Sequence, residues 1–163
     1  MPQISTAYST QKETTAAITE IKSKILIPQP KAVLFFASSS YPAVDLAKGM
    51  QEAFPDTIVF GCTTAGELVN DQMLKNSVVA MAFDHNIIED IRLEVLENIN
   101  QEDNTRTVLD KFAEHFRKPV LDLDFDKYFG FILFDGLSGA EERVMASLGA
   151  QSNIIFIGGS AGD

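Results

Sequence analysis

Two stretches of this chain each join a short apolar run to a small-residue segment that closes with an acid. They are Ile58-Val59-Phe60-Gly61-Cys62-Thr63-Thr64-Ala65-Gly66-Glu67 and Ile155-Phe156-Ile157-Gly158-Gly159-Ser160-Ala161-Gly162-Asp163. The apolar runs predict strands, and the small residues predict loops. Glycine admits positive φ and leaves backbone N–H groups uncovered, while hydroxyls and carboxylates supply donors and acceptors. A pair of such loops suggests an internally duplicated binding site.

A similar strand and helix precede each stretch. Aligning Thr64-Ala65-Gly66-Glu67 with Ser160-Ala161-Gly162-Asp163 gives an offset of 96 residues, and the upstream strands align only after an indel of a few positions. Each half therefore contains a strand, a helix, a second strand and a glycine loop, which indicates a supersecondary duplication rather than a solenoid. The corresponding upstream segments are residues 31–38 and 43–53 in the first half, and residues 128–135 and 140–148 in the second.

Length and composition narrow the class of protein. The 163 residues, 45% of them hydrophobic, predict a single folded domain with a substantial core. The net charge of −10 argues against binding to nucleic acid or to anionic lipid, both of which attract basic surfaces. Because the chain lacks a signal peptide and any apolar run near the roughly 20 residues that span a bilayer, we expect a cytoplasmic protein. The one cysteine, Cys62, cannot form an intrachain disulfide.

Hydrophobic periodicity predicts both helices and strands. Capping boxes are expected at residues 10–13 and 138–141, and Gly149 suits a helix that ends at Leu148. The expected helices cover residues 11–24, 43–53, 103–117 and 140–148, and the expected strands cover residues 32–37, 57–60, 77–83, 91–95 and 128–135.

This order of elements predicts an α/β fold. Strands that alternate with helices through short loops indicate a layered, mainly parallel sheet built from two duplicated strand-helix-strand-glycine-loop halves. Residues 77–83 are continuously apolar and residues 91–95 alternate strictly, so we expect an antiparallel hairpin that turns near residues 84–86. The second half has no such hairpin after its loop, and we therefore expect the chain to be the N-terminal fragment of a longer protein.

The carboxyl ends of the strands are the expected location of a site, because ligands of such sheets bind there. Both glycine loops, the serine run at residues 38–40, and Asp135 with Gly136 all follow predicted strands. Asp135 is notable, since a carboxylate at the end of a central strand is costly unless it is paired or used.

The chain resembles the N-terminal domain of the FIST family in three linked segments. These are residues 60–67, the run Phe134-Asp135-Gly136 followed by Glu141-Glu142, and residues 157–163, whose order and approximate spacing agree with the family across nearly the whole chain. The resemblance implies an intracellular sensory module of bacteria or archaea that is coupled to signalling outputs and binds small ligands such as amino acids. It also implies a C-terminal partner domain, which this chain lacks, and a variant that binds haem to sense nitric oxide.

The favoured hypothesis is a ligand-binding sensory domain that is not an enzyme. Backbone N–H groups of the loops around Gly61, Cys62, Gly158 and Gly159, with Thr63, Thr64 and Ser160, are expected to hold an anionic group such as a carboxylate. Asp135 with Gly136, Glu67 or Asp163 is expected to bind an amine, although Glu67 and Asp163 are also candidate helix caps. We expect no metal, since the acidic run at residues 122–126 lacks the glycine and the closing glutamate of a calcium loop. The sequence leaves open whether the protein binds a cofactor.

Three alternatives remain open for individual residues. Residues 158–162 match G-x-S-x-G, the nucleophile elbow of serine hydrolases, although both histidines, His85 and His115, precede Ser160. Either histidine could ligate haem in a nitric oxide sensor. Cys62 is either a nucleophile or redox sensor, or simply a small buried side chain, which is the commoner role.

Overall fold

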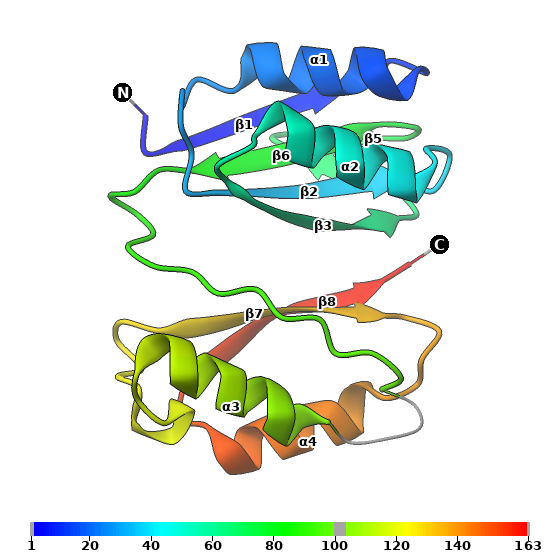
Figure 1. The fold of residues 1–163 in the computed structure, drawn as a ribbon. Helices are drawn as coiled ribbons and strands as arrows, with labels where there is room; N and C mark the ends of the chain where they lie inside the picture. The colour runs from blue at the N-terminus through cyan, green and yellow to red at the C-terminus, as the bar shows by residue number, and fades with distance from the viewer. Residues whose placement is uncertain (1, 100–103, 163) are drawn as a thin grey trace. The chain divides into compact units, whose positions relative to one another are not determined.

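The computed structural model describes residues 2–99 and 104–162 and has a mixed α/β fold, as predicted (Figure 1). The chain divides into two compact units. Unit 1 contains Met1–Ile91 together with Gly162–Asp163, and unit 2 contains Arg92–Ala161. Each unit has its own hydrophobic core and is described here by itself. The expectation of one domain over the whole chain stays a prediction.

Unit 1 is built on a four-stranded sheet. The spatial order of its strands is β1 (Ile4–Ser9), β6 (Val78–Phe83), β2 (Ala32–Ser38) and β3 (Ile58–Thr64). β2 runs parallel to β3, whereas β6 is antiparallel to both β1 and β2. The apolar sequence of β2 suits this central position, because most of its residues are buried.

Two helices cover one face of this sheet, α1 (Thr14–Lys24) and α2 (Ala43–Ala53) (Figure 1). Ile21, Met50 and Phe54 are at most 1% exposed and form the centre of the core. Burial of each such side chain contributes about 1.5–3 kcal/mol. The helix layer and the alternate residues of β2 and β6 therefore hold unit 1 together.

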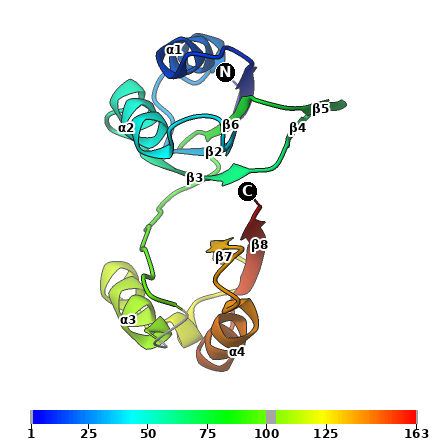
Figure 2. The ribbon, with the colours of Figure 1, turned by 90° about the vertical axis from the view of Figure 1, so that its right-hand side faces the viewer.

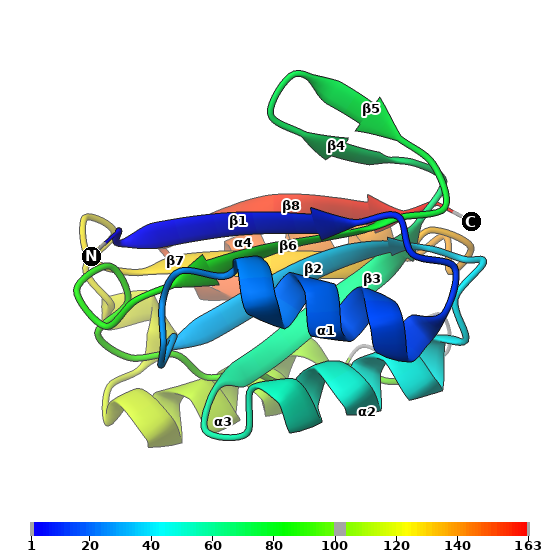
Figure 3. The ribbon, with the colours of Figure 1, turned by 90° about the horizontal axis from the view of Figure 1, so that it is seen from above.

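A short hairpin connects β3 to β6. Its strands are β4 (Glu67–Val69) and β5 (Gln72–Leu74), joined through Asn70, whose φ of 53° is tolerated by asparagine. Figure 3 shows the hairpin extending beyond the four-stranded sheet. These strands are not predicted from the sequence, where a loop is expected after β3.

Unit 2 contains the second parallel strand pair. α3 (Thr105–Phe116) and a 3-10 turn (Val120–Asp122) are followed by β7 (Phe129–Asp135), α4 (Glu141–Gln151) and β8 (Ile155–Ala161). β7 and β8 are parallel, and both helices lie on the same side of the pair (Figure 2). The buried core of the unit consists of Leu109, Val120, Leu123, Phe134, Ala140, Val144 and Leu148.

Several predicted boundaries were wrong. Neither expected capping box forms, because no side chain caps α1 at Glu13 or α4 at Ala140, and α1 begins at Thr14 rather than at residue 11. α4 continues past Gly149 to Gln151. The hairpin expected between residues 77–83 and 91–95 does not form, because β6 pairs with β1 and β2 instead and residues 91–95 are not in a strand.

Candidate functional site

The two glycine-rich stretches are strands rather than loops, which corrects the sequence prediction. β3 includes Gly61, Cys62, Thr63 and Thr64, and β8 includes Gly158, Gly159 and Ser160. The small residues were interpreted as turn formers, but the parallel ladders continue through them. The backbone N–H groups of these stretches therefore belong to strands.

Close backbone approach explains why glycine occupies positions 61 and 158. Gly61 pairs with Phe35, and a Cβ added to it would lie 2.0 Å from the carbonyl oxygen of Phe35. Gly158 pairs with Ile132, and its Cβ would lie 1.7 Å from the carbonyl oxygen of Ile132. Gly158 also has a φ of 147°, which L side chains rarely adopt. Each glycine thus permits its strand to lie against its neighbour.

The two ladders correspond residue for residue. β2 pairs with β3 from Ala32 and Ile58, and β7 pairs with β8 from Phe129 and Ile155, so that both strands differ by the same 97 residues. The same offset relates Gly61 to Gly158. The strand pairing therefore fixes an offset one residue larger than the 96 obtained by aligning the closing acids. Duplication of the sequence itself stays a prediction.

Glu67 lies in β4 and is buried, so its interpretation as a helix cap was wrong. Its carboxylate accepts a hydrogen bond from Thr64 Oγ1 at 2.7 Å, and both the backbone N–H and the hydroxyl of Ser77 donate to its other oxygen. These bonds compensate for the loss of water around the charge. Both oxygens of Glu67 are therefore already engaged within unit 1.

Tyr41 lies in the same unit and has a raised pKa. Burial is the main cause, and the negative charges of Glu67 and Glu20 add to it, because each disfavours the phenolate. The Tyr41 hydroxyl donates to the carbonyl oxygens of Gln11, at 2.6 Å, and Asn76, at 3.2 Å. The polar groups near the end of β2 thus join separate segments of unit 1.

Three polar side chains and a glycine of unit 2 lie near the carboxyl ends of β7 and β8. Ser160 Oγ donates to Glu141 Oε1 at 2.9 Å, which connects β8 to the first turn of α4. Asp135 is exposed, and its Oδ1 accepts the N–H of Leu137 at 2.9 Å. A Cβ added to Gly136 would lie 2.3 Å from the carbonyl oxygen of Ala161 and 3.6 Å from Ser160 Cβ. We call Asp135, Gly136, Glu141 and Ser160 the unit 2 cluster.

Glu141 is the member of this cluster that is not among the predicted site residues. It was interpreted only as the acidic partner in a capping box and as part of a family segment. Its position in the first turn of a helix that follows a strand is the signal that could have identified it, because such a carboxylate lies near the strand's carboxyl end. Ser160 lies inside β8, whereas a nucleophile elbow places its serine on a strand-to-helix turn.

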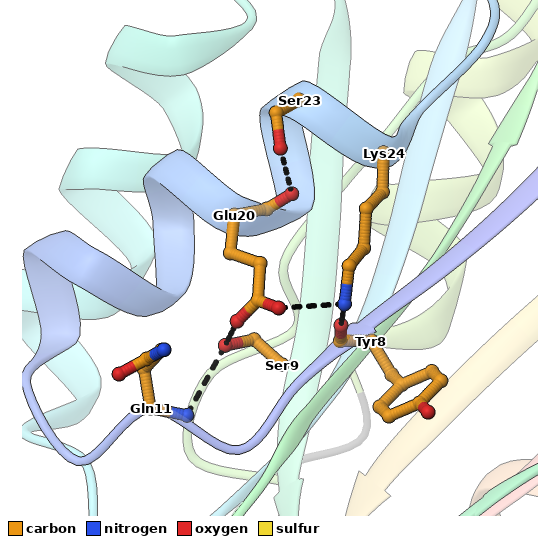
Figure 4. Close-up of polar contacts among 6 residues, drawn as sticks. All are labelled: Tyr8, Ser9, Gln11, Glu20, Ser23 and Lys24. Carbon is orange, nitrogen blue, oxygen red and sulfur yellow. Dashed lines mark hydrogen bonds and ion pairs between the residues drawn. The ribbon is translucent and has the colours of Figure 1, made fainter.

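A second polar cluster, on α1 and β1, was also missed (Figure 4). Glu20 accepts a hydrogen bond from Ser9 Oγ at 2.6 Å and forms an ion pair with Lys24 at 2.6 Å. Lys24 Nζ also donates to the carbonyl oxygen of Tyr8 at 2.9 Å. The bonds from Lys24 and then Ser9 hold the pKa of Glu20 below its ordinary value. The i, i+4 spacing of Glu20 and Lys24 was the available signal.

The remaining candidates are distributed over both units. Cys62 is partly buried in β3, and Gly159 is exposed in β8. His85 lies in a turn after β6, and His115 contacts Phe116 edge-on in α3. Asp163 lies outside the described residues. No helix in the described part of the chain is long and apolar enough to cross a bilayer.

Comparison with known proteins identifies the family of this α/β chain. The chain belongs to the FIST N domain family, which matches residues 31–163. FIST domains are sensory domains of signal transduction. The chain is also similar to the uncharacterized protein MJ1623 of Methanocaldococcus jannaschii, with 30% identity over 118 residues. That match covers 71% of this chain and 23% of the relative, so the chain spans about a quarter of the relative's length.

Proposed function

We propose that this sensory domain binds a small ligand carrying a free amino group, with amino acids as the favoured class. The unit 2 cluster carries the proposal, because a hydrogen-bonded pair, Ser160 and Glu141, and a second carboxylate, Asp135, all lie near the carboxyl ends of a parallel strand pair. The domain acts by binding rather than by catalysis, and it works in the cytoplasm as part of a larger signalling protein. A partner domain that follows it transmits the signal.

The chemistry of the cluster favours a cationic amine. Asp135 is exposed and Glu141 is partly exposed, so a ligand ammonium can pair with either carboxylate without first breaking a buried contact. The Ser160 hydroxyl is both a donor and an acceptor, and it can donate to a ligand carboxylate once the amine has taken its place on Glu141. An amino acid presents both groups within one small molecule.

Unit 1 supplies a weaker candidate for the amine site. Glu67 is 2% exposed and already accepts hydrogen bonds from Thr64 and Ser77. An amine that paired with Glu67 would have to displace these bonds and be stripped of its water, which costs several kcal/mol for a charged group. The exposed carboxylates of unit 2 require neither step.

A thermal-shift screen of the twenty amino acids tests the proposal. A ligand at a hundredfold excess over its Kd stabilises a protein by about 2.7 kcal/mol, which raises the Tm by several degrees. We expect one or a few amino acids to produce such a rise. Glu141→Gln is expected to abolish it, whereas Glu142→Gln, which removes the same charge from the next residue of α4, is expected to leave it intact.

The thermal shifts of the wild type and of the Glu141→Gln variant together show whether the unit 2 cluster is the ligand site. An amino acid that stabilises the wild type and the Glu141→Gln variant equally would place its site outside the unit 2 cluster. The absence of stabilisation by every amino acid and by related amines would refute the proposed ligand class. The screen should be run on this chain and on the longest natural protein that contains it.

A further inference from the structure

β1 forms an outer edge of the four-stranded sheet of unit 1. Within the residues that the structure describes, its strand partner is β6, and the Asp84 N–H donates to the carbonyl oxygen of Gln3 at 3.0 Å. Alternate residues of an antiparallel strand bond to the same neighbour, so every second residue counted from Gln3 faces β6. The backbone N–H and C=O groups of Ile4, Thr6 and Tyr8 therefore point away from the sheet.

The outer edge of β1 has the properties of a surface for pairing with an identical strand. Backbone groups at a strand edge form a template for another chain. β1 is 6 residues long and carries no charged side chain, and Ile4 and Thr6 are both exposed. In an antiparallel pair of two copies centred on Thr6, the carbonyl group of Tyr8 lies opposite the N–H of Ile4 in the second copy. The Tyr8 carbonyl is therefore an acceptor that such a pair requires.

Lys24 of α1 occupies this carbonyl group (Figure 4). Its Nζ donates to the carbonyl oxygen of Tyr8 at 2.9 Å and lies 4.7 Å from the centre of the Tyr8 ring. Glu20, one helical turn earlier, forms its ion pair with Lys24 at 2.6 Å and accepts the Ser9 hydroxyl at 2.6 Å. Contacts with both β1 and α1 thus hold the ammonium group at the strand edge.

We propose that Lys24 guards the outer edge of β1 and keeps two copies of this chain from joining edge to edge. The strand of a second copy would have to place an N–H at the Tyr8 carbonyl oxygen, to which the Lys24 ammonium already donates. The added strand would also strip water from that ammonium or separate it from Glu20, and either change is unfavourable for a charged group. Lysine at a sheet edge is a common means of preventing edge-to-edge pairing.

Sedimentation velocity of the full chain over a range of concentrations tests the proposal with Lys24→Met. This variant keeps a long unbranched side chain but removes its charge and its donors. It is expected to self-associate at least about tenfold more strongly than the wild type, because each copy gains an edge hydrogen bond. Lys22→Met is the matched control, since it removes the same charge from an exposed lysine of the same helix whose Nζ lies over the Phe54 ring. The control is expected to associate no more than the wild type.

A second change locates the contact between the two copies. Thr6 lies opposite its own counterpart in the two-fold pair, so Thr6→Asp places two like charges against each other there, which is unfavourable. When it is added to Lys24→Met, it should return self-association to the wild-type level. Hydrogen exchange in Lys24→Met alone should slow at the amides of Ile4, Thr6 and Tyr8 as the protein concentration rises.

Three results would overturn the proposal. The first is self-association of Lys24→Met that is no stronger than that of the wild type. The second is an equal rise in Lys22→Met, because loss of a positive charge alone would then explain the effect. The third is self-association of the double variant that is as strong as that of Lys24→Met, because the contact between copies would then lie outside the edge of β1.

Discussion

Adding one methyl group at Gly158 is expected to destabilise unit 2 severely. The Cβ of alanine would lie 1.7 Å from the carbonyl oxygen of Ile132, far inside van der Waals contact, and the φ of 147° is unfavourable for any L side chain. Forcing extra atoms into a packed site costs about 1–3 kcal/mol, and a sparsely populated backbone conformation costs about 1–3 kcal/mol more. The expected loss for Gly158→Ala is therefore about 2–6 kcal/mol.

The neighbouring glycine provides a matched control. A Cβ at Gly159 would meet no atom within 4 Å, so Gly159→Ala is expected to change stability by less than about 1 kcal/mol. Urea unfolding followed by far-UV circular dichroism compares the two variants. With a slope near 1 kcal/mol per M for a small unit, the Gly158→Ala midpoint should fall by about 2 M or more. Equal midpoints for the two variants would refute the close approach of β7 and β8.

Three further changes test other contacts in the two units. Gly149→Ala places a methyl group in open space within α4 and should raise the free energy of unfolding by about 0.5–1 kcal/mol, measured by urea unfolding; a loss would contradict the geometry of that helix. Ser77→Ala removes a hydroxyl that donates to the buried Glu67 carboxylate, and calorimetry should show a loss of about 1.5–3 kcal/mol. Hydrogen bonds from Lys111 and Arg92 lower the pKa of Glu94. Its carboxylate therefore stabilises unit 2 at pH values above the pKa of the unfolded state, and this stabilisation is lost as the pH falls through the pKa of the folded state. Glu94→Gln should therefore lower the free energy of unfolding by less than about 1 kcal/mol at pH 7 and leave it unchanged in acid. A loss of stability that persists in acid would count against the ion pairs.

Patterns confined to one element were predictable from the sequence. α2 occupies residues 43–53 as expected, because its apolar stripe and the preceding proline are local signals. The central strands β2 and β6 were also found, since both are continuously apolar runs of strand length. β1 was missed because its sequence, Ile4-Ser5-Thr6-Ala7-Tyr8-Ser9, alternates with small polar residues that become buried only when α1 covers them.

Features that depend on distant partners could not be predicted in the same way. Gly61 and Gly158 are of a residue type that is typical of turns. Glycine is needed at these positions because a neighbouring strand lies too close for a Cβ. Glu67 was expected to cap a helix or bind an amine, whereas its partner Ser77 lies ten residues further along the chain and engages it once β6 joins the sheet. Residues 91–95 have the alternation of a strand but no strand partner among the described residues, so the pattern alone misassigned them to a hairpin.

The charge of the unit 2 cluster is the property on which amine recognition depends. Asp135 and Glu141 are both acidic, and neither forms an ion pair with a described Lys, Arg or His within unit 2. A ligand ammonium would supply the missing positive charge, and its pairing with exposed carboxylates would weaken as ionic strength rises. A binding affinity that increases with salt would be incompatible with this mode of recognition.

A ¹H–¹⁵N NMR titration with the amino acid that stabilises the protein most is the most direct test of the unit 2 cluster as the ligand site. We expect saturable chemical-shift changes centred on the amides of Asp135, Gly136, Glu141 and Ser160, and their loss in the Glu141→Gln variant. Saturable changes centred instead on Thr64 and Glu67, or an unaltered spectrum at saturating ligand, would contradict the account.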